Sequence, residues 1–178
     1  MIIGFPFIFV LMIFIILLCN DNSSSSPQIM ATAEFQCPFE ANVNYHITSG
    51  FGYRIDPLNR GTLFHDGIDL SVPMGTNILA SNSGKVVRAG YQVGGLGNYV
   101  CIEHVIKDVK YYSCYGHMLD NSIVVHEGQQ VKVGDKLGSV GMSGAATGYH
   151  LHFMILTPEL EFSKQYAIDP TPLAGWLK

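Results

Sequence analysis

The chain of 178 residues is long enough for one domain with a real hydrophobic core, but short for two. Its formal net charge is −4 and only 13% of its residues are charged, so it offers no basic stripe for binding nucleic acid. The 19 glycines and nine tyrosines are typical of a chain with many tight turns and short strands, which predicts an all-β domain.

The N-terminus begins with an apolar run, IIGFPFIFVLMIFIILL, that covers residues 2–18 without a polar side chain. Such a run is long for a signal-peptide core and lies at the lower limit for a membrane-spanning helix. We therefore expect residues 1–19 to be a signal peptide or a membrane anchor, which places the remainder outside the cytoplasm. Cys19 suggests a lipid-modified cysteine, but Leu18 stands where lipoprotein signals carry a small residue, so lipidation is the minority interpretation.

Residues 20–34 are polar and low in complexity, and they predict a flexible linker before a single domain over residues 35–178. That domain shows no helix-length pattern. Alternating apolar residues between Gly, Pro and Asn turns predict short strands within residues 47–61, 67–72, 76–81, 84–92, 98–105, 111–118, 123–141 and 149–156. Strands of this length and spacing predict an antiparallel β-sandwich or barrel-like sheet, preceded by the N-terminal hydrophobic helix.

The three remaining cysteines, Cys37, Cys101 and Cys114, lack the close paired spacing of a structural zinc site. Cys101 and Cys114 fall on two apolar runs that the polar segment KDVK separates, which is typical of a hairpin. A cross-strand disulfide and a pair of buried thiols both agree with this pattern, and the sequence leaves the two open.

Five side chains in three separate segments carry the chemistry: His65 and Asp69 in FHDGIDL, His117 in YGHM, and His150 and His152 in GYHLHF. His150 and His152 lie two apart on a strand, so both project from one face. Two histidines and one carboxylate are what a catalytic zinc ion takes from a protein when it keeps a position for water. The two remaining histidines are then free to move protons.

The local arrangement around His65 depends on the residues that follow it. We expect His65 to end a loop and Asp69 to lie one pleat into the following strand, with a turn at Asp66 and Gly67 that brings the two together. Taken alone, the segment also agrees with aspartates that merely stabilise a turn. His117, which ends a strand after the small Gly116, agrees equally with a surface or capping histidine.

The remaining histidines have no second ligand type nearby in the sequence, and we expect them to be structural or solvated: His46, His104 and His126.

The order of these motifs resembles the LytM/lysostaphin-type zinc metallopeptidases, family M23. The resemblance runs from about Ile47 to Pro170 and includes SGFGYRIDP, HDGIDLSVPMGT, LASNSGKVV, GNYVCIEH, GQQVKVGDKLGSVGMSG and ATGYHLHF. Two positions depart from the family pattern: Met154 stands where a Glu is common after HLHF, and Asn77 where a Pro is common after GT. Both lie outside the ligand set, so they bear on substrate contacts more than on the chemistry.

The resemblance implies a role for each of the five side chains. His65, Asp69 and His152 would be the ligands of one zinc ion. His117 and His150 would act on water and on the tetrahedral intermediate. The implied activity is that of a zinc metalloendopeptidase that hydrolyses the peptide cross-links of bacterial cell-wall peptidoglycan.

The same resemblance implies a groove that holds an extended peptide. The loops around residues 53–64 and 141–149 would flank it, and Tyr53, Tyr91 and Tyr149 are candidates for its walls. Two other functions stay open: a non-catalytic module that activates another wall hydrolase, and a structural part of a larger envelope machine.

Overall fold

The computed structural model describes residues 35–55 and 61–177. The predictions for residues 1–19 and for the linker 20–34, including the hydrophobic helix and Cys19, lie outside the described residues. Within these two ranges no helix is long and apolar enough to cross a membrane.

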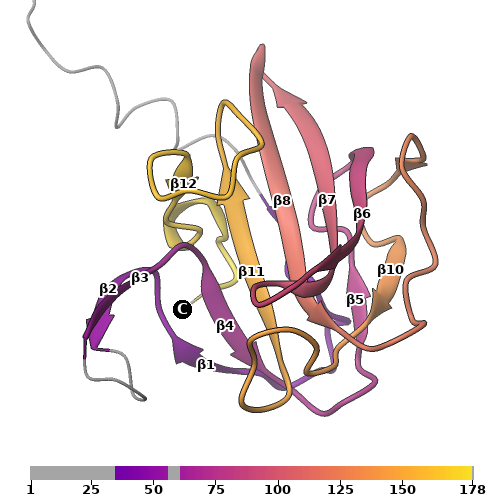
Figure 1. Ribbon diagram of the computed structural model, residues 1–178. Helices are drawn as coiled ribbons and strands as arrows, with labels where there is room; N and C mark the ends of the chain where they lie inside the picture. The colour runs from indigo at the N-terminus through magenta and orange to yellow at the C-terminus, as the bar shows by residue number, and fades with distance from the viewer. Residues whose placement is uncertain (1–34, 56–60, 178) are drawn as a thin grey trace, which may run out of the picture.

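Eight strands form the main sheet, in the order β1-β4-β11-β8-β7-β6-β9 with β12 paired to β11 (Figure 1). Every pairing in this sheet is antiparallel. The strands are β1 (His46–Ser49), β4 (Ile68–Ser71), β6 (Gly84–Gln92), β7 (Gly97–Ile106), β8 (Val109–Met118), β9 (Gln130–Val131), β11 (His150–Leu156) and β12 (Ala167–Ile168). This arrangement confirms the predicted antiparallel all-β fold.

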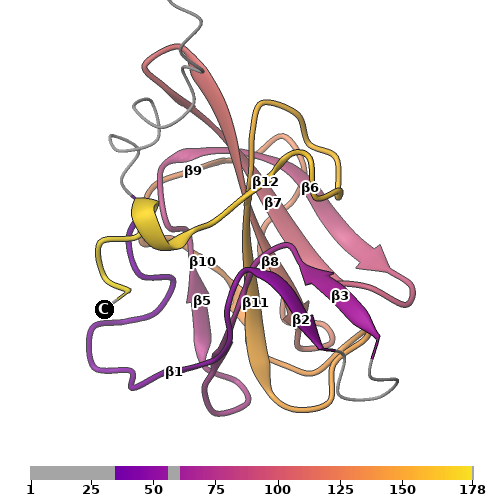
Figure 2. The ribbon, with the colours of Figure 1, turned by 90° about the vertical axis from the view of Figure 1, so that its left-hand side faces the viewer.

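Two short antiparallel ribbons complete the fold. They pair β5 (Asn77–Leu79) with β10 (Lys136–Ser139), and β2 (Gly52–Ile55) with β3 (Thr62–His65). Figure 2 shows the two ribbons on opposite sides of β11. A 3-10 helix, η2 (Thr171–Leu173), lies near the C-terminus. The β5–β10 ribbon covers the face of the sheet that holds the main core, because Ile78 and Leu137 belong to that core.

The side chains of β11 alternate between the main core and the opposite face of the sheet. Leu151, Phe153 and Ile155 are fully buried in the main core. Successive side chains on a strand point to opposite faces, so His150 and His152 project from the other side of the sheet. A second apolar cluster on that side is made of Leu96, Cys101, Tyr112, Cys114, Met154, Leu156 and Ala167. The face of the sheet that carries His150 and His152 thus has a small hydrophobic cluster of its own.

The structure corrects the prediction that His65 ends a loop. Residues 62–65 form strand β3, in which His65 is paired with Gly52 of β2. Phe64 anchors the ribbon, since its ring lies 5.2 Å from that of Phe51 and 5.1 Å from that of Tyr53. This strand was not predicted from the sequence because the strand has only four residues and follows a segment rich in Gly, Pro and Asn. His65 is therefore held by a strand pairing.

Cys101 and Cys114 form a disulfide between β7 and β8, which settles the alternative that the sequence left open. The two residues are directly opposite in the ladder, with their Cα atoms 4.2 Å apart, and both are fully buried. The connecting turn is shorter than predicted, since Lys107 and Asp108 alone make it, with φ values of 50° and 62°. Positive φ at both central residues is typical of two-residue hairpin turns. Cys37 is a free, half-buried thiol.

His104 is a structural histidine, as predicted, and it makes the domain sensitive to acid. Its ring is 1% exposed and its two nitrogens lie 2.8 Å from the Ser83 carbonyl oxygen and 2.8 Å from the Ser113 hydroxyl. Burial lowers the pKa of His104 below its ordinary value, although the hydrogen bond to Ser83 opposes this. Neutral His104 therefore contributes stability above the unfolded-state pKa of about 6.5, and this stability is lost as the pH falls.

We expect the wild-type free energy of unfolding to fall with acid more steeply than that of His104→Gln. One proton accounts for a difference of at most about 1.4 kcal/mol per pH unit below about pH 6.5. Urea unfolding of both proteins in chelator, at several pH values between about 7.5 and 5, measures the two slopes. Chelator removes any bound metal from both proteins, so the remaining histidines are compared in the same state. Parallel slopes would contradict the prediction.

Candidate metal centre

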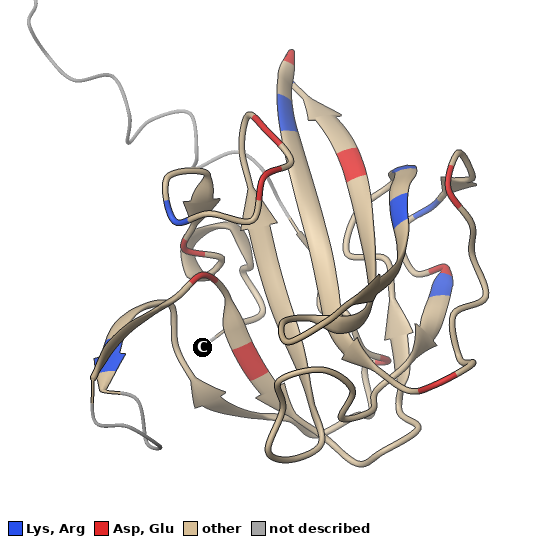
Figure 3. Ribbon diagram, in the orientation of Figure 1, with Lys and Arg blue, Asp and Glu red and all other residues tan. Residues whose placement is uncertain are grey.

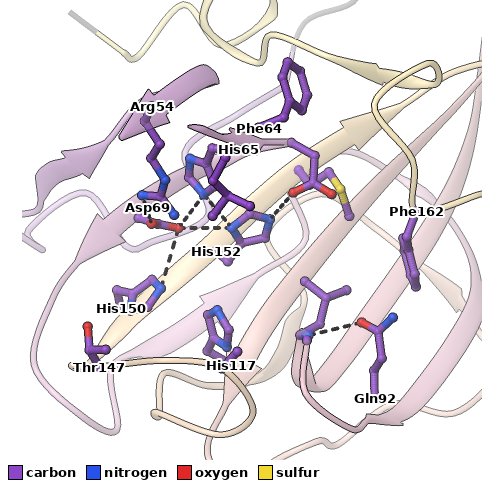
Figure 4. Close-up of a pocket in the computed structure, with 16 residues that line it drawn as sticks. Arg54, Phe64, His65, Asp69, Gln92, His117, Thr147, His150, His152 and Phe162 are labelled. Carbon is purple, nitrogen blue, oxygen red and sulfur yellow. Dashed lines mark hydrogen bonds and ion pairs between the residues drawn. The ribbon is translucent and has the colours of Figure 1, made fainter. Parts of the chain in front are cut away.

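Three elements bring His65, Asp69 and His152 together. Asp69 on β4 is directly opposite His152 in the ladder with β11. His65 is the last residue of β3, and the two residues Asp66 and Gly67 connect it to β4. The three side chains therefore converge from two neighbouring strands and one strand end, as Figure 4 shows.

The ligand atoms of these three residues form a nearly equilateral triangle. The His65 Nε2 atom lies 3.1 Å from Asp69 Oδ1 and 3.1 Å from His152 Nδ1, and the latter two are 3.0 Å apart. Two ligands of a tetrahedral zinc ion, each at about 2.0–2.1 Å, are about 3.3 Å apart. All three residues are at most 8% exposed. The donor set and its spacing fit one metal ion with three protein ligands.

Each imidazole of the triangle has its other nitrogen turned away from the centre. The His65 Nδ1–H donates to the Gly50 carbonyl oxygen at 2.7 Å, so its lone pair is on Nε2, inside the triangle. The corresponding outer nitrogen of His152, Nε2, faces Asp66 at 3.3 Å. Outer contacts of this kind fix the tautomer and the orientation of metal-binding histidines.

Charged groups of both signs lie at and around the triangle. Arg54 on β2 donates to the Ser49 hydroxyl and lies 3.6 Å from Asp69 Oδ2. Burial would raise the pKa of Asp69, but hydrogen bonds and charges from His152 and His65 outweigh it and hold this pKa well below its usual range. Burial would likewise lower the pKa of His152, yet Asp66 and Asp69 raise it to about 9. Metal binding must therefore displace a proton from His152.

His117 and His150 form a second pair beside the triangle. Their ring centroids are 4.6 Å apart, and the His150 Nε2 atom is 3.5 Å from Asp69 Oδ1. Backbone carbonyl oxygens accept the Nδ1–H of each ring: Ser143 accepts from His117 at 2.7 Å, and Gly148 accepts from His150 at 2.9 Å. In both residues Nδ1 is therefore bonded to the backbone, and Nε2 is the nitrogen left for other contacts. The structure brings all five predicted side chains into one site.

Burial, and to a smaller extent the neighbouring His150 and His152, lower the pKa of His117 to about 4, although its hydrogen bond to Ser143 opposes this shift. At neutral pH this imidazole is uncharged and has a lone pair to accept a proton.

The backbone at His117 is irregular, and this irregularity aims its side chain. His117 has a φ of 57°, in the left-handed region that residues other than glycine rarely adopt. Its N–H donates to the Leu96 carbonyl at 2.7 Å, and its own carbonyl accepts from the Gly141 N–H at 3.0 Å. These bonds hold the strained residue between two loops. Strain of this kind persists where the surrounding structure enforces it, and it is common at functional sites.

The site opens into a cavity of about 530 Å³. Besides the five predicted residues, its lining includes Arg54, Leu63, Phe64, Asp66, Gln92, Gly95, Leu96, Ala145, Thr147, Met154 and Phe162. Both segments predicted to flank the groove, 53–64 and 141–149, therefore contribute to the wall, but the lining residues of the first lie on strands β2 and β3. Figure 3 shows that basic and acidic positions are interspersed over the described chain, so charge near the cavity comes from individual residues.

The three tyrosines predicted as groove walls, Tyr53, Tyr91 and Tyr149, do not line this cavity and are largely exposed. Side chains alternate along β2, so the neighbour of Tyr53, Arg54, points into the cavity in its place. Phe64 and Phe162 provide the aromatic walls (Figure 4).

Three lining residues gave no clear signal in the sequence. Phe162 lies in the segment after β11, and its ring stacks edge-on with Tyr99 at 5.6 Å while the Arg88 guanidinium lies 5.6 Å from its centroid. Arg54 follows Tyr53 in a motif that the resemblance includes, but nothing in the sequence placed it beside Asp69. Asp66 was visible only as a turn residue.

Comparison with known proteins agrees with this geometry. Residues 63–170 match the model of peptidase family M23. The catalytic domain of the antimicrobial peptidase lysostaphin from Staphylococcus simulans aligns with a TM-score of 0.63 and 33% identity, over 72% of this chain and 91% of that domain. A zinc-containing peptidase from Vibrio cholerae aligns with a TM-score of 0.62 and 31% identity, over 79% of this chain and 39% of that one.

A curated relative is the peptidoglycan DD-endopeptidase ShyB of Vibrio cholerae, which is 37% identical over 111 residues, 62% of this chain and 25% of the relative. The first curated relatives that the chain matches are much longer, and it spans 22% to 33% of their length.

Proposed function

Because this chain belongs to peptidase family M23, we propose that it is a zinc-dependent endopeptidase that hydrolyses peptide cross-links of bacterial peptidoglycan. The observation that carries this proposal is the triangle of His65, Asp69 and His152, with two further imidazoles beside it at one cavity. Relatives named as peptidoglycan DD-endopeptidase and as DD-carboxypeptidase/endopeptidase support the substrate class. We also propose that the domain acts outside the cytoplasm, secreted or anchored through residues 1–19.

In this proposal His65 Nε2, Asp69 Oδ1 and His152 Nδ1 would hold one zinc ion. The bound ion would supply a Lewis acid that lowers the pKa of a water molecule and polarises the scissile carbonyl. Arg54 keeps Asp69 oriented through its contact with Oδ2, so that Oδ1 remains turned toward the two imidazoles. The hydrogen bond from His65 to Gly50 has the same effect on the second ligand.

His117 and His150 would handle the protons. Each presents Nε2, because its Nδ1–H is bonded to a backbone carbonyl. The low pKa of His117, about 4, keeps it neutral and able to accept a proton from the attacking water. His150, when protonated on both nitrogens, would donate its Nε2–H to the oxygen on which negative charge develops, and whichever ring carries the extra proton could pass it to the leaving amine. The two rings pack against each other, with their centroids 4.6 Å apart, so both can reach the same reacting group.

The cavity suits an extended peptide. Phe64 and Phe162 offer apolar contacts, while Arg54 brings a positive charge beside the triangle. Met154, which departs from the family pattern, is fully buried in the floor and gives an apolar surface where a carboxylate is common. Phe64, Phe162 and Arg54 would contact the substrate side chains that flank the scissile bond, with Met154 packed beneath them.

Digestion of purified peptidoglycan tests the proposal. The full chain, loaded with zinc, is incubated with bacterial sacculi, and the released fragments are identified by mass spectrometry. We expect cross-linked fragments to decline as un-crosslinked ones appear, and chelator to stop this change. A protein that binds zinc but leaves every cross-link intact would contradict the proposed activity and favour a module that acts through another hydrolase.

A further inference from the structure

His152 differs from the other three imidazoles of the site in what lies against its outer nitrogen. Backbone carbonyls of Gly50, Ser143 and Gly148 accept the outer N–H of the other three rings. For His152 the facing group is a carboxylate, with Asp66 Oδ1 at 3.3 Å from Nε2. His152 thus has the only charged outer partner among these four histidines, and that partner lies three residues before the ligand Asp69.

The Nε2 atom of His152 needs such a partner. The residue is 5% exposed, and within residues 35–55 and 61–177 this atom is buried without a hydrogen bond of good geometry. A buried N–H without an acceptor is destabilising. When Nδ1 binds a metal, the proton of the neutral ring is necessarily on Nε2. A small rotation of the Asp66 carboxylate would turn the 3.3 Å contact into a hydrogen bond to that proton.

We propose that Asp66 is a positioning residue, which accepts the His152 Nε2–H and so directs the Nδ1 lone pair toward the metal. This inference rests on the proposed zinc site. A carboxylate in this place also raises the basicity of the ligand nitrogen, as outer carboxylates do for other metal-binding histidines. With Arg54 and Asp69 included, the immediate surroundings of the metal then carry one net negative charge.

The chain is built so that Asp66 can do this. It begins the two-residue connection between β3 and β4, so the pairing of both strands fixes its backbone. Gly67, the next residue, lets the His152 ring come close, because a Cβ there would lie 2.9 Å from the Cε1 and Nε2 atoms of that ring. The Asp66 side chain remains 33% exposed, so its charge keeps some hydration. Asp66 and Gly67 together form the surface against which the Nε2 edge of the His152 ring packs.

The competing interpretation is that Asp66 only stabilises the turn. The two roles differ in what a substitution changes. A turn residue affects the stability of the metal-free fold, whereas a partner of His152 affects the affinity for metal. Asp66→Asn keeps a carbonyl acceptor and removes the charge, and Asp66→Ala removes both. Asp108→Asn is the matched control, since Asp108 is exposed at the tip of the β7–β8 hairpin, away from the site.

The test measures zinc affinity of the full chain by competition with a chelator of known affinity. Loss of an outer partner typically costs about 10–100-fold in metal affinity. We expect Asp66→Ala to lose affinity within that range, Asp66→Asn to fall between Ala and wild type, and Asp108→Asn to match wild type. In NMR spectra of the zinc-loaded proteins, the His152 Nε2 proton should exchange with water faster in Asp66→Ala than in wild type.

Thermal unfolding in chelator separates the two roles. Variants that melt earlier but bind zinc as wild type does, with unchanged exchange of the Nε2 proton, would overturn the inference and establish the turn role. Should Asp66→Ala not fold, Asp66→Asn alone decides between the same two results. A graded loss of zinc affinity in a protein that leaves peptidoglycan intact would support Asp66 as the positioning residue while rejecting the proposed substrate.

Discussion

Asp69→Asn is expected to abolish tight zinc binding and, with it, the hydrolysis of peptidoglycan peptides. Asp69 provides the only carboxylate corner of the triangle, 3.1 Å from His65 Nε2 and 3.0 Å from His152 Nδ1. A neutral amide oxygen is a much weaker ligand for a divalent ion, and it would also leave Arg54 without its ionic partner. We expect the loss of affinity to exceed the roughly 100-fold that removal of an outer partner can cost.

Zinc content after dialysis and the rate of cross-link cleavage measure this effect. Asp108→Asn makes the same chemical change at an exposed hairpin tip and should retain both properties. Circular dichroism in chelator shows whether Asp69→Asn is folded, which it should be, since its strand pairs on both sides. A folded Asp69→Asn protein that keeps one tightly bound zinc ion would rule out the proposed ligand set.

His117→Ala and His150→Ala are also expected to lose turnover, but unlike Asp69→Asn each should keep its zinc ion. Neither ring belongs to the triangle, and each has only Nε2 to offer to a reacting group. A positioned general acid or base typically contributes about 10²–10⁴-fold to a rate, so kcat should fall by that factor in each variant. Because the two rings touch and would work on the same protons, the double variant should lose less than the product of the two single losses.

His126→Ala is the matched control for this pair, since His126 is exposed and, within the described residues, the hydrogen bond of its ring goes to the carbonyl of the adjacent Glu127. Zinc content is measured beside kcat for every variant. A variant that loses zinc in step with activity would reassign that histidine as a ligand. Full activity in both single variants would remove the proton-transfer roles and favour the non-catalytic module.

Much of the site was visible in the sequence because its signals are local. The alternation HLHFMIL by itself places His150 and His152 on one face and Leu151, Phe153 and Ile155 on the other, and β11 has this arrangement. The segment GIDL likewise places Asp69 on the face opposite to Ile68 and Leu70. The order of the motifs indicated the resemblance to family M23, and this resemblance predicted that five side chains distant in the sequence lie in one site. The roles of these five as ligands or proton carriers stay predictions.

Other features could not be predicted, because they depend on which strands become neighbours. The 4.2 Å spacing of Cys101 and Cys114 follows from the register of β7 against β8. Arg54 meets Asp69 only because the short β2–β3 ribbon folds over the site, and Phe162 meets the cavity only through the segment after β11. A sequence pattern reports which face a side chain takes, but register and ribbon placement arise from long-range pairing.

The sequence by itself determined the all-β class, the faces of the strands and the choice of five candidate site residues, because periodicity and residue type act over a few neighbouring positions. The tertiary structure alone decided that His65 is carried by a strand, that phenylalanines rather than tyrosines line the cavity, and that Asp66 faces His152. Each of these depends on contacts between segments far apart in the chain, whose geometry is set when the strands pair and pack.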